Sequence, residues 1–140
     1  MFQKLTRFSD LGILLVRLMV AVVFIDSGWK DLLDLVHRSV SIGMSQHFTV
    51  FLAVAEIAGG LGVAFGLFTQ LAAMGLIVVS CGALEKKIFA WHTGFWGGKS
   101  YGWHYDMLFL VMNLLIVFTD GGRYTLKNAV PLPPKWKRLL

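Results

Sequence analysis

Four side chains of this sequence have types and surroundings suited to moving protons or hydrogen-bonding a polar ligand: Glu56, His92, His104 and Asp106. Glu56 is the most informative, because it is the one charged residue in the long apolar stretch 48–68. An ionisable group in such a segment costs about 2.5 kcal/mol or more unless it faces protein, water or a counter-ion. A carboxylate at this position therefore indicates either a functional site or a structural ion pair.

The elements that must position these residues are membrane-spanning helices. Of the 140 residues, 56% are hydrophobic and only 15% are charged, and the mean hydropathy is +0.68. This composition excludes an ordinary soluble domain. Apolar runs close to the ~20 residues that cross a bilayer as a helix recur along the chain. We predict an all-α fold, an integral membrane four-helix bundle forming one transmembrane domain (1–140), with spans at 11–30, 48–68, 71–91 and 103–119 and a basic C-terminal tail at 120–140.

The net charge of +5 does not predict nucleic-acid binding, because the basic residues lie in the tails and loops around the apolar runs. Membrane topology and contact with anionic lipid explain these charges. Lysine and arginine are concentrated at the two ends of the chain, so we predict an inner-membrane protein with both termini in the cytoplasm. The single cysteine, Cys81, has no partner for a disulfide within the chain.

Helical spacing suggests which charges meet. Asp26 and Lys30 are four residues apart and share one face of the first span as a favourable pair. Arg17 lies nearer the inner side, and its long side chain is predicted to reach toward Glu56 as the first partner of that carboxylate. This pair either fixes helix register alone or also borders a ligand.

Two further patterns concern the other spans. On the fourth, one helical stripe carries polar groups into the bundle: Trp103, Asp106, Leu110 and Asn113. On the second, Ala55, Gly59, Gly62 and Gly66, with Gly60 beside them, form a ridge of small residues typical of close packing between membrane helices. The third span is expected to stay helical through Lys86 and Lys87 to Trp91, with the lysines reaching the headgroups.

His92, His104 and Asp106 allow three interpretations: proton-handling or hydrogen-bonding groups, metal ligands, or ordinary interfacial polar residues. Two histidines on different helices, without a short-spaced ligand motif, argue against a metal site. The sequence also contains no haem, flavin or iron–sulfur ligation pattern.

The order and spacing of several residues within four spans resemble the DoxX family of small four-helix membrane proteins. The resemblance covers roughly 15–127 and rests on Arg17, Gly28, Lys30, Glu56, Gly60, Gly66, Thr69, His92, Gly122, Arg123 and Tyr124. Gln70 departs from the family pattern where a basic residue is common, and Lys127 departs where an aspartate is usual. The resemblance implies a quinone-linked redox membrane protein, because relatives include subunits of a thiosulfate:quinone oxidoreductase.

A quinone site in a helix bundle needs an apolar slot, an aromatic surface and polar groups at the two carbonyl oxygens. We expect a quinone or similar lipophilic redox molecule to bind near Glu56, with Glu56, His92, His104 or Asp106 exchanging protons. Binding contacts are expected from Arg17, Trp29, Lys30, Trp103, Tyr105 and Asn113.

Electrons would then come from a partner redox protein or a soluble reductant. The alternative is a non-enzymatic membrane anchor or assembly subunit for a partner protein, in which the buried charges serve structure alone. A small solute or ion carrier is a third interpretation, and it would require a homo-oligomer to form a path, because the sequence has no internal repeat.

Overall fold

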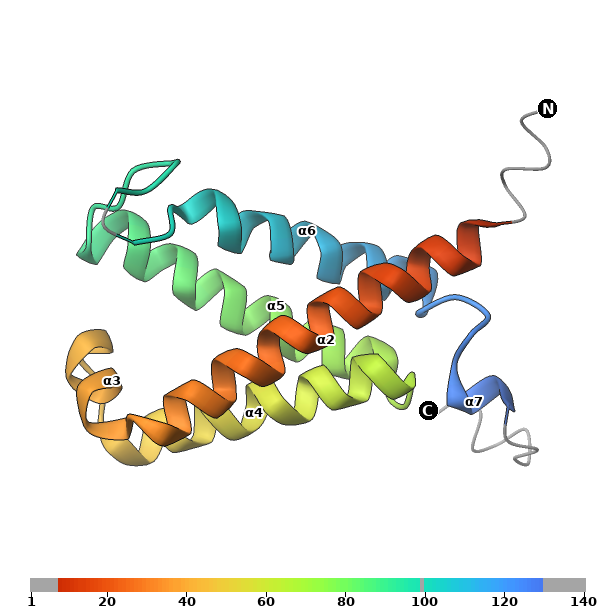
Figure 1. Ribbon diagram of the computed structural model, residues 1–140, viewed down its shortest axis with the longest axis horizontal. Coiled ribbons are helices and arrows are strands. Elements are labelled where there is room, and N and C mark those ends of the chain that lie inside the picture. Colours follow the sequence, from red (N-terminus) through yellow and green to blue (C-terminus); the bar gives the residue numbers. More distant parts are fainter. Residues whose placement is uncertain (1–7, 99, 130–140) are drawn as a thin grey trace.

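The computed structural model describes residues 8–98 and 100–129, and the regular elements in them are helices (Figure 1). Four long helices form a bundle: α2 (Ser9–Leu33), α4 (Gln46–Phe65), α5 (Thr69–Glu85) and α6 (Trp103–Thr119). Three short elements join or follow them: α3 (Leu35–Ile42), the π-helix η2 (Lys86–Ala90) and α7 (Leu126–Ala129). The prediction of an all-α four-helix bundle is confirmed.

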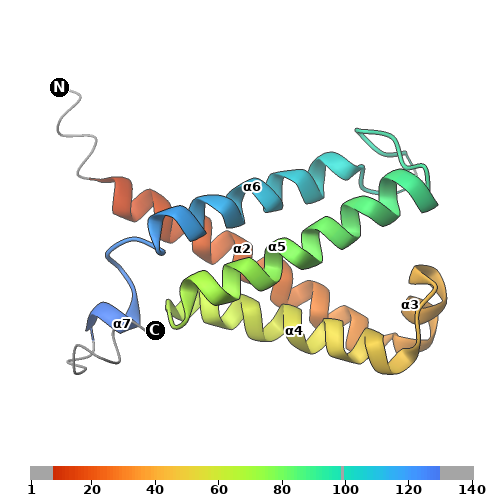
Figure 2. The same cartoon turned by 180° about the vertical axis from the view of Figure 1, so that it is seen from behind.

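The bundle has two distinct ends (Figures 1 and 2). The start of α2, the turn between α4 and α5, and α7 lie toward one end, which we call the terminal end. The other end holds α3 and the connecting segments 91–98 and 100–102, and we call it the loop end.

Local sequence explains the bounds of α4. Ser45 precedes the helix, and its side chain accepts a hydrogen bond from the backbone N–H of Phe48 at 3.3 Å, as an N-cap should. Gly66 ends the helix in the left-handed conformation, with φ of +71°, a backbone geometry that glycine adopts without a steric penalty. The chain then reverses, so α4 and α5 form an antiparallel hairpin.

Glycines bring α2 and α4 into close contact at two levels. A Cβ atom built on Gly28 would lie 2.5 Å from the carbonyl oxygen of Ala53, and one on Gly60 would lie 2.8 Å from the side chain of Ile25. These helices therefore stay together from the middle of the bundle to the loop end.

In contrast, the close glycine contacts between α4 and α5 lie toward the terminal end. A Cβ on Gly59 would lie 2.7 Å from Leu76, and one on Gly62 would lie 2.9 Å from Ala72, whereas a Cβ on Gly82 would meet nothing within 4 Å. The predicted ridge of small residues in the second span is thus confirmed as a packing surface. The pair α2/α4 and the pair α5/α6 diverge toward the loop end (Figures 1 and 2).

The outward faces of the long helices are apolar, as lipid contact requires. Large hydrophobic side chains are more than half exposed on each of them: Leu15, Val22, Phe51, Val78 and Phe118. By length and composition α2 and α4 could each cross a membrane, and α6 is a shorter apolar helix. The chain is accordingly an all-α membrane protein.

The third predicted span ends differently from the expectation. The α-helix stops at Glu85, and the chain continues to Ala90 as the π-helix η2. Part of the predicted basic tail, 130–140, lies outside the described residues, as do Lys4, Arg7 and Lys99. In the described part of the tail, Lys127 forms an ion pair with Asp120, directly after α6.

Candidate functional site

A cavity of about 490 Å³ lies between the two helix pairs at the loop end. Its apolar wall comes from α3, α4, α5 and the segment before α4, through Ile42, Met44, Phe48, Leu52, Val78 and Val79. Polar and charged side chains line the rest, together with three aromatic ones: Trp91, Tyr101 and Tyr105. A mostly apolar cavity of this size with a few convergent polar groups is typical of small-molecule sites. We call it the loop-end pocket.

Glu56 lines this pocket from α4 and is almost completely buried, with 5% of its surface exposed. Gly28 of α2 packs behind it, since a Cβ there would lie 3.2 Å from the Cβ of Glu56. Among the described residues, no group hydrogen-bonds the Oε2 atom of this carboxyl. A buried polar atom without a partner costs about 1–3 kcal/mol, so this oxygen is poised for a proton, a water molecule or a ligand.

An ion pair crosses from the third helical segment to the fourth beside the pocket. The Nζ atom of Lys87 in η2 lies 2.5 Å from Oδ2 of Asp106 in α6, and each side chain is only 15% exposed. The ammonium also lies 5.7 Å from the ring centre of Tyr105. The expectation that Lys87 extends to the headgroups is therefore wrong, because a buried carboxylate offers it a partner within the protein.

The tyrosines form a flat surface in the same region. The rings of Tyr101 and Tyr105 are nearly parallel, with an interplanar angle of 21° and centroids 5.4 Å apart. Both rings line the loop-end pocket. An aromatic ligand could extend this stack.

Two further ion pairs border the pocket. Lys30 contacts Asp26 at 2.6 Å on the exposed face of α2, which confirms the predicted pair. Arg38 of α3 contacts Asp31 at 2.9 Å and holds the short helix against the end of α2. Lys30, Asp31 and Arg38 line the pocket.

The predicted pairing of Arg17 with Glu56 is wrong. Arg17 is fully buried toward the terminal end, and its guanidinium donates hydrogen bonds to four backbone carbonyl oxygens: Val63 at 2.8 Å, Ala64 at 2.9 Å, Gly121 at 3.1 Å and Tyr124 at 2.5 Å. The first two carbonyls belong to the last turn of α4, where helical carbonyls lack intrahelical partners and the helix dipole is negative. Arg17 therefore joins α2 to the C-terminal end of α4 and to the segment after α6.

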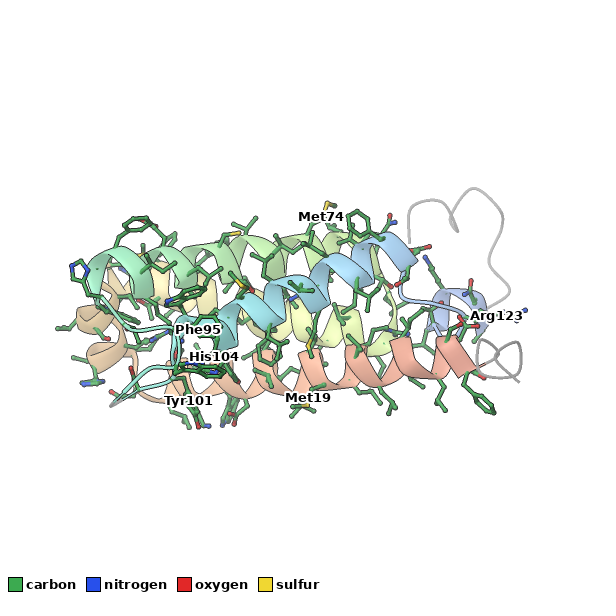
Figure 3. The ribbon with its side chains drawn as sticks, turned by 90° about the horizontal axis from the view of Figure 1, so that it is seen from above. Met19, Met74, Phe95, Tyr101, His104 and Arg123 are labelled. Carbon is green, nitrogen blue, oxygen red and sulfur yellow. The ribbon has the colours of Figure 1, made fainter. Side chains whose placement is uncertain are left out.

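The remaining predicted site residues lie away from the pocket lining. His104 points its Nδ1 atom at the carbonyl oxygen of Phe95, 2.5 Å away, so this nitrogen carries a proton. Trp103 packs on the ring of Phe95, with centroids 4.6 Å apart. Figure 3 shows Phe95, Tyr101 and His104 gathered at the loop end, far from Arg123.

His92 and Trp29 are exposed. Asn113 is buried, and its side-chain amide donates to the carbonyl oxygen of Phe109 at 2.9 Å, one turn earlier in α6. The structure thus brings Glu56, Asp106, Lys30 and Tyr105 to one pocket and leaves the other six predicted residues elsewhere: Arg17, Trp29, His92, Trp103, His104 and Asn113. The roles assigned to all ten stay predictions.

Sequence reasoning missed Asp31, Arg38, Lys87 and Tyr101 as members of the site. The spacing of Asp31 and Arg38, seven residues apart across a break between two helices, carries no simple helical signal. The charged run 85–87 inside an otherwise apolar segment was the available signal for Lys87. Among the described residues, no cluster of three or more metal-ligating side chains is present.

Comparison with known proteins decides the family. The DoxX family profile matches residues 12–93, more than half of the chain. The chain belongs to the DoxX family. Its DoxX relatives include the inner membrane protein YqjF of Escherichia coli (strain K12), which is 23% identical over 134 residues, 93% of this chain and 98% of that protein. No protein of solved structure matches this DoxX chain significantly.

Family membership and this relative support a membrane location for the protein. The cytoplasmic placement of the two termini stays a prediction.

Proposed function

We propose that this DoxX protein binds a quinone in the loop-end pocket and acts as a quinone-linked redox protein or redox subunit of the membrane. One observation carries the proposal: Glu56, whose buried carboxyl has an oxygen, Oε2, with no hydrogen-bond partner among the described residues, lines a largely apolar cavity of about 490 Å³. Such a cavity accommodates a ligand with an apolar body and a few polar atoms.

The lining residues fit a quinone ring. The stacked Tyr101 and Tyr105 offer an aromatic surface for the ring. The carbonyl oxygens of a quinone accept hydrogen bonds, and the ammonium groups of Lys30 and Lys87 have three donor protons each. Lys87 forms an ion pair with Asp106, which holds the ammonium beside the pocket.

A bound quinone supplies two-electron, two-proton redox chemistry. Glu56 holds or accepts a proton at Oε2, a position shielded from water by burial. Lys87 donates a hydrogen bond to a carbonyl oxygen of the ligand, and Asp106 orients Lys87 for this contact. The electrons come from outside this chain, from a partner redox protein or a soluble reductant.

Equilibrium binding of duroquinone, a quinone without a hydrocarbon tail, tests the proposal. Quenching of tryptophan fluorescence in purified protein should saturate for the wild type. Glu56→Gln should weaken binding by roughly tenfold, equivalent to about 1.4 kcal/mol, because an amide N–H donates a weaker hydrogen bond to a quinone carbonyl oxygen than a carboxyl O–H does. Asp34→Asn is the matched control, since it removes an exposed carboxylate at the same end outside the pocket lining. Absence of saturable quenching in folded wild-type protein would overturn the proposal.

The alternative function is a membrane anchor or assembly subunit. The hydrogen bonds of Arg17 favour it, because this buried charge joins three segments of the chain and serves structure alone. An anchor predicts that Glu56→Gln lowers folded yield or recovery of a partner protein and leaves quinone binding unaffected. The two functions therefore differ in the measured dissociation constant of duroquinone.

A further inference from the structure

We propose that the loop-end pocket opens sideways into the membrane between α4 and α5, and that its ligand carries a hydrocarbon tail that leaves through this opening. The inference rests on the proposed function, which identifies the polar head of the ligand as a quinone ring. It adds that the ligand is lipid-like and that it enters the pocket from the membrane. Three observations of the described residues carry it.

The first observation is the spacing of α4 and α5. The two helices touch at Gly62 against Ala72 and at Gly59 against Leu76, where an added Cβ would lie within 3 Å of the neighbour. At Gly82, nearly two helical turns beyond Leu76, an added Cβ meets nothing within 4 Å. Gly82 lines the pocket, and α4 and α5 diverge toward this end of the bundle (Figures 1 and 2).

The second observation is that residues of the pocket wall also lie on the outer surface. Val78 of α5 is 72% exposed and Phe48 of α4 is 42% exposed, yet both line the cavity. Val78 lies seven residues before the end of α5, roughly 10 Å from that end along the helix axis. The cavity is consequently bordered by apolar side chains of α4 and α5 that are also exposed, at a level well inside α5.

The third observation is the distribution of polarity around the opening. The wall between α4 and α5 is built from Phe48, Leu52, Val78, Val79 and Gly82, which offer a hydrocarbon chain only apolar contacts. The charged side chains Lys30, Asp31, Arg38 and Glu85 line the pocket from other positions nearer the loop end. A polar head would lie at Glu56 and the charged groups, while an apolar tail would follow the α4/α5 wall.

Carbodiimides of opposite solubility test the lateral opening in phosphatidylcholine proteoliposomes. The carboxyl O–H of Glu56 adds across a C=N bond of the reagent, and the resulting adduct is identified by peptide mass spectrometry. Dicyclohexylcarbodiimide partitions into the membrane, whereas ethyl-dimethylaminopropyl-carbodiimide attacks from water. We expect the membrane reagent to modify Glu56 in the wild type.

Two variants obstruct the opening without disturbing a packed contact. Gly82→Phe places a ring in open space beside the cavity, and Val78→Trp enlarges a side chain that already faces lipid. Gly75→Phe is the matched control, because Gly75 also has nothing within 4 Å but does not line the pocket. Both obstructing variants should slow modification by the membrane reagent at least several-fold and slow the water-soluble reagent much less, while the control reacts like the wild type.

Three results would overturn the lateral opening: no modification of wild-type Glu56 by the membrane reagent, unchanged rates in both obstructing variants, or equal slowing of the two reagents. The proposed function is tested separately by adding decylubiquinone, which should protect Glu56. Modification that depends on position 82 without protection by decylubiquinone would support the opening and count against the quinone. If duroquinone binding depended on Glu56 but the rate of Glu56 modification did not change with the residue at position 82, the quinone site would be supported and the lateral opening would be overturned.

Discussion

The ammonium of Lys87 lies 2.5 Å from the carboxylate of Asp106, and this contact ties the π-helical end of the third helical segment to the first turn of α6. Single π-helical turns occur frequently at functional sites. Here the π-helix coincides with a lysine directed at a neighbouring carboxylate, and both residues line the loop-end pocket.

The coupling between Lys87 and Asp106 is measurable by a double-mutant cycle. Lys87→Met and Asp106→Asn should each lower the free energy of unfolding, and the double variant should lose less than the sum, with a coupling of about 1–2 kcal/mol. Thermal or denaturant unfolding in detergent provides the measurement. The exposed pair of Asp26 and Lys30 is the control and should show much weaker coupling, because water competes for both charges. Equal coupling in the two pairs would contradict this account.

Arg17 should be essential for stability rather than for ligand binding. Arg17→Met leaves the four carbonyl oxygens that it serves without their donor, in a site closed to water. The free energy of unfolding should fall by roughly 3 kcal/mol or more, with loss of the monodisperse peak in gel filtration.

Arg123→Met is the matched control for Arg17, since Arg123 is an exposed arginine at the same end of the bundle (Figure 3). It should leave the unfolding transition nearly unchanged. If Arg17→Met folded with wild-type stability and lost only duroquinone binding, Arg17 would belong to the ligand site after all.

The close contact of α2 and α4 depends on Gly28. Gly28→Ala places a methyl group 2.5 Å from the carbonyl oxygen of Ala53, so the helices must move apart at the level of Glu56. We expect a loss of about 1–3 kcal/mol in unfolding free energy. Gly75→Ala, which has open space around it, should be neutral or stabilising by up to about 1 kcal/mol. Similar melting temperatures for the two variants would show that the α2/α4 contact is not tight.

The helical architecture and part of the site follow from the sequence for clear physical reasons. Apolar runs of membrane-crossing length predict the long helices, and the spacing of Gly59 and Gly62 predicts a packing face. The carboxylate of Glu56 in an apolar segment indicates a site because its burial is costly. The structure places this residue at a cavity.

Arg17 shows where such reasoning fails. Counting residues along two antiparallel helices gives approximate depths, but α4 presents Glu56 near Gly28, roughly 16 Å along α2 from Arg17. Side chains on a helix also lean toward its N-terminus, which directs Arg17 away from Glu56. The attraction of a guanidinium to the carbonyls that end a helix is not visible in a pattern of charged side chains.

The contact of Lys87 with Asp106 was beyond prediction for a different reason. A π-helical turn shifts the direction of every following side chain, and residue spacing on an ideal α-helix does not include this shift. The bond between Asp31 and Arg38 likewise depends on the angle between α2 and α3, which no local pattern sets.

The central claim is that the loop-end pocket holds a quinone ring beside Glu56, and a structure of the wild-type protein in lipid nanodiscs saturated with duroquinone tests it most directly. The account predicts density for the ring within hydrogen-bonding distance of the Glu56 carboxyl and in contact with Tyr105. Density for the ring at another site, or an empty pocket at saturating duroquinone, would contradict it.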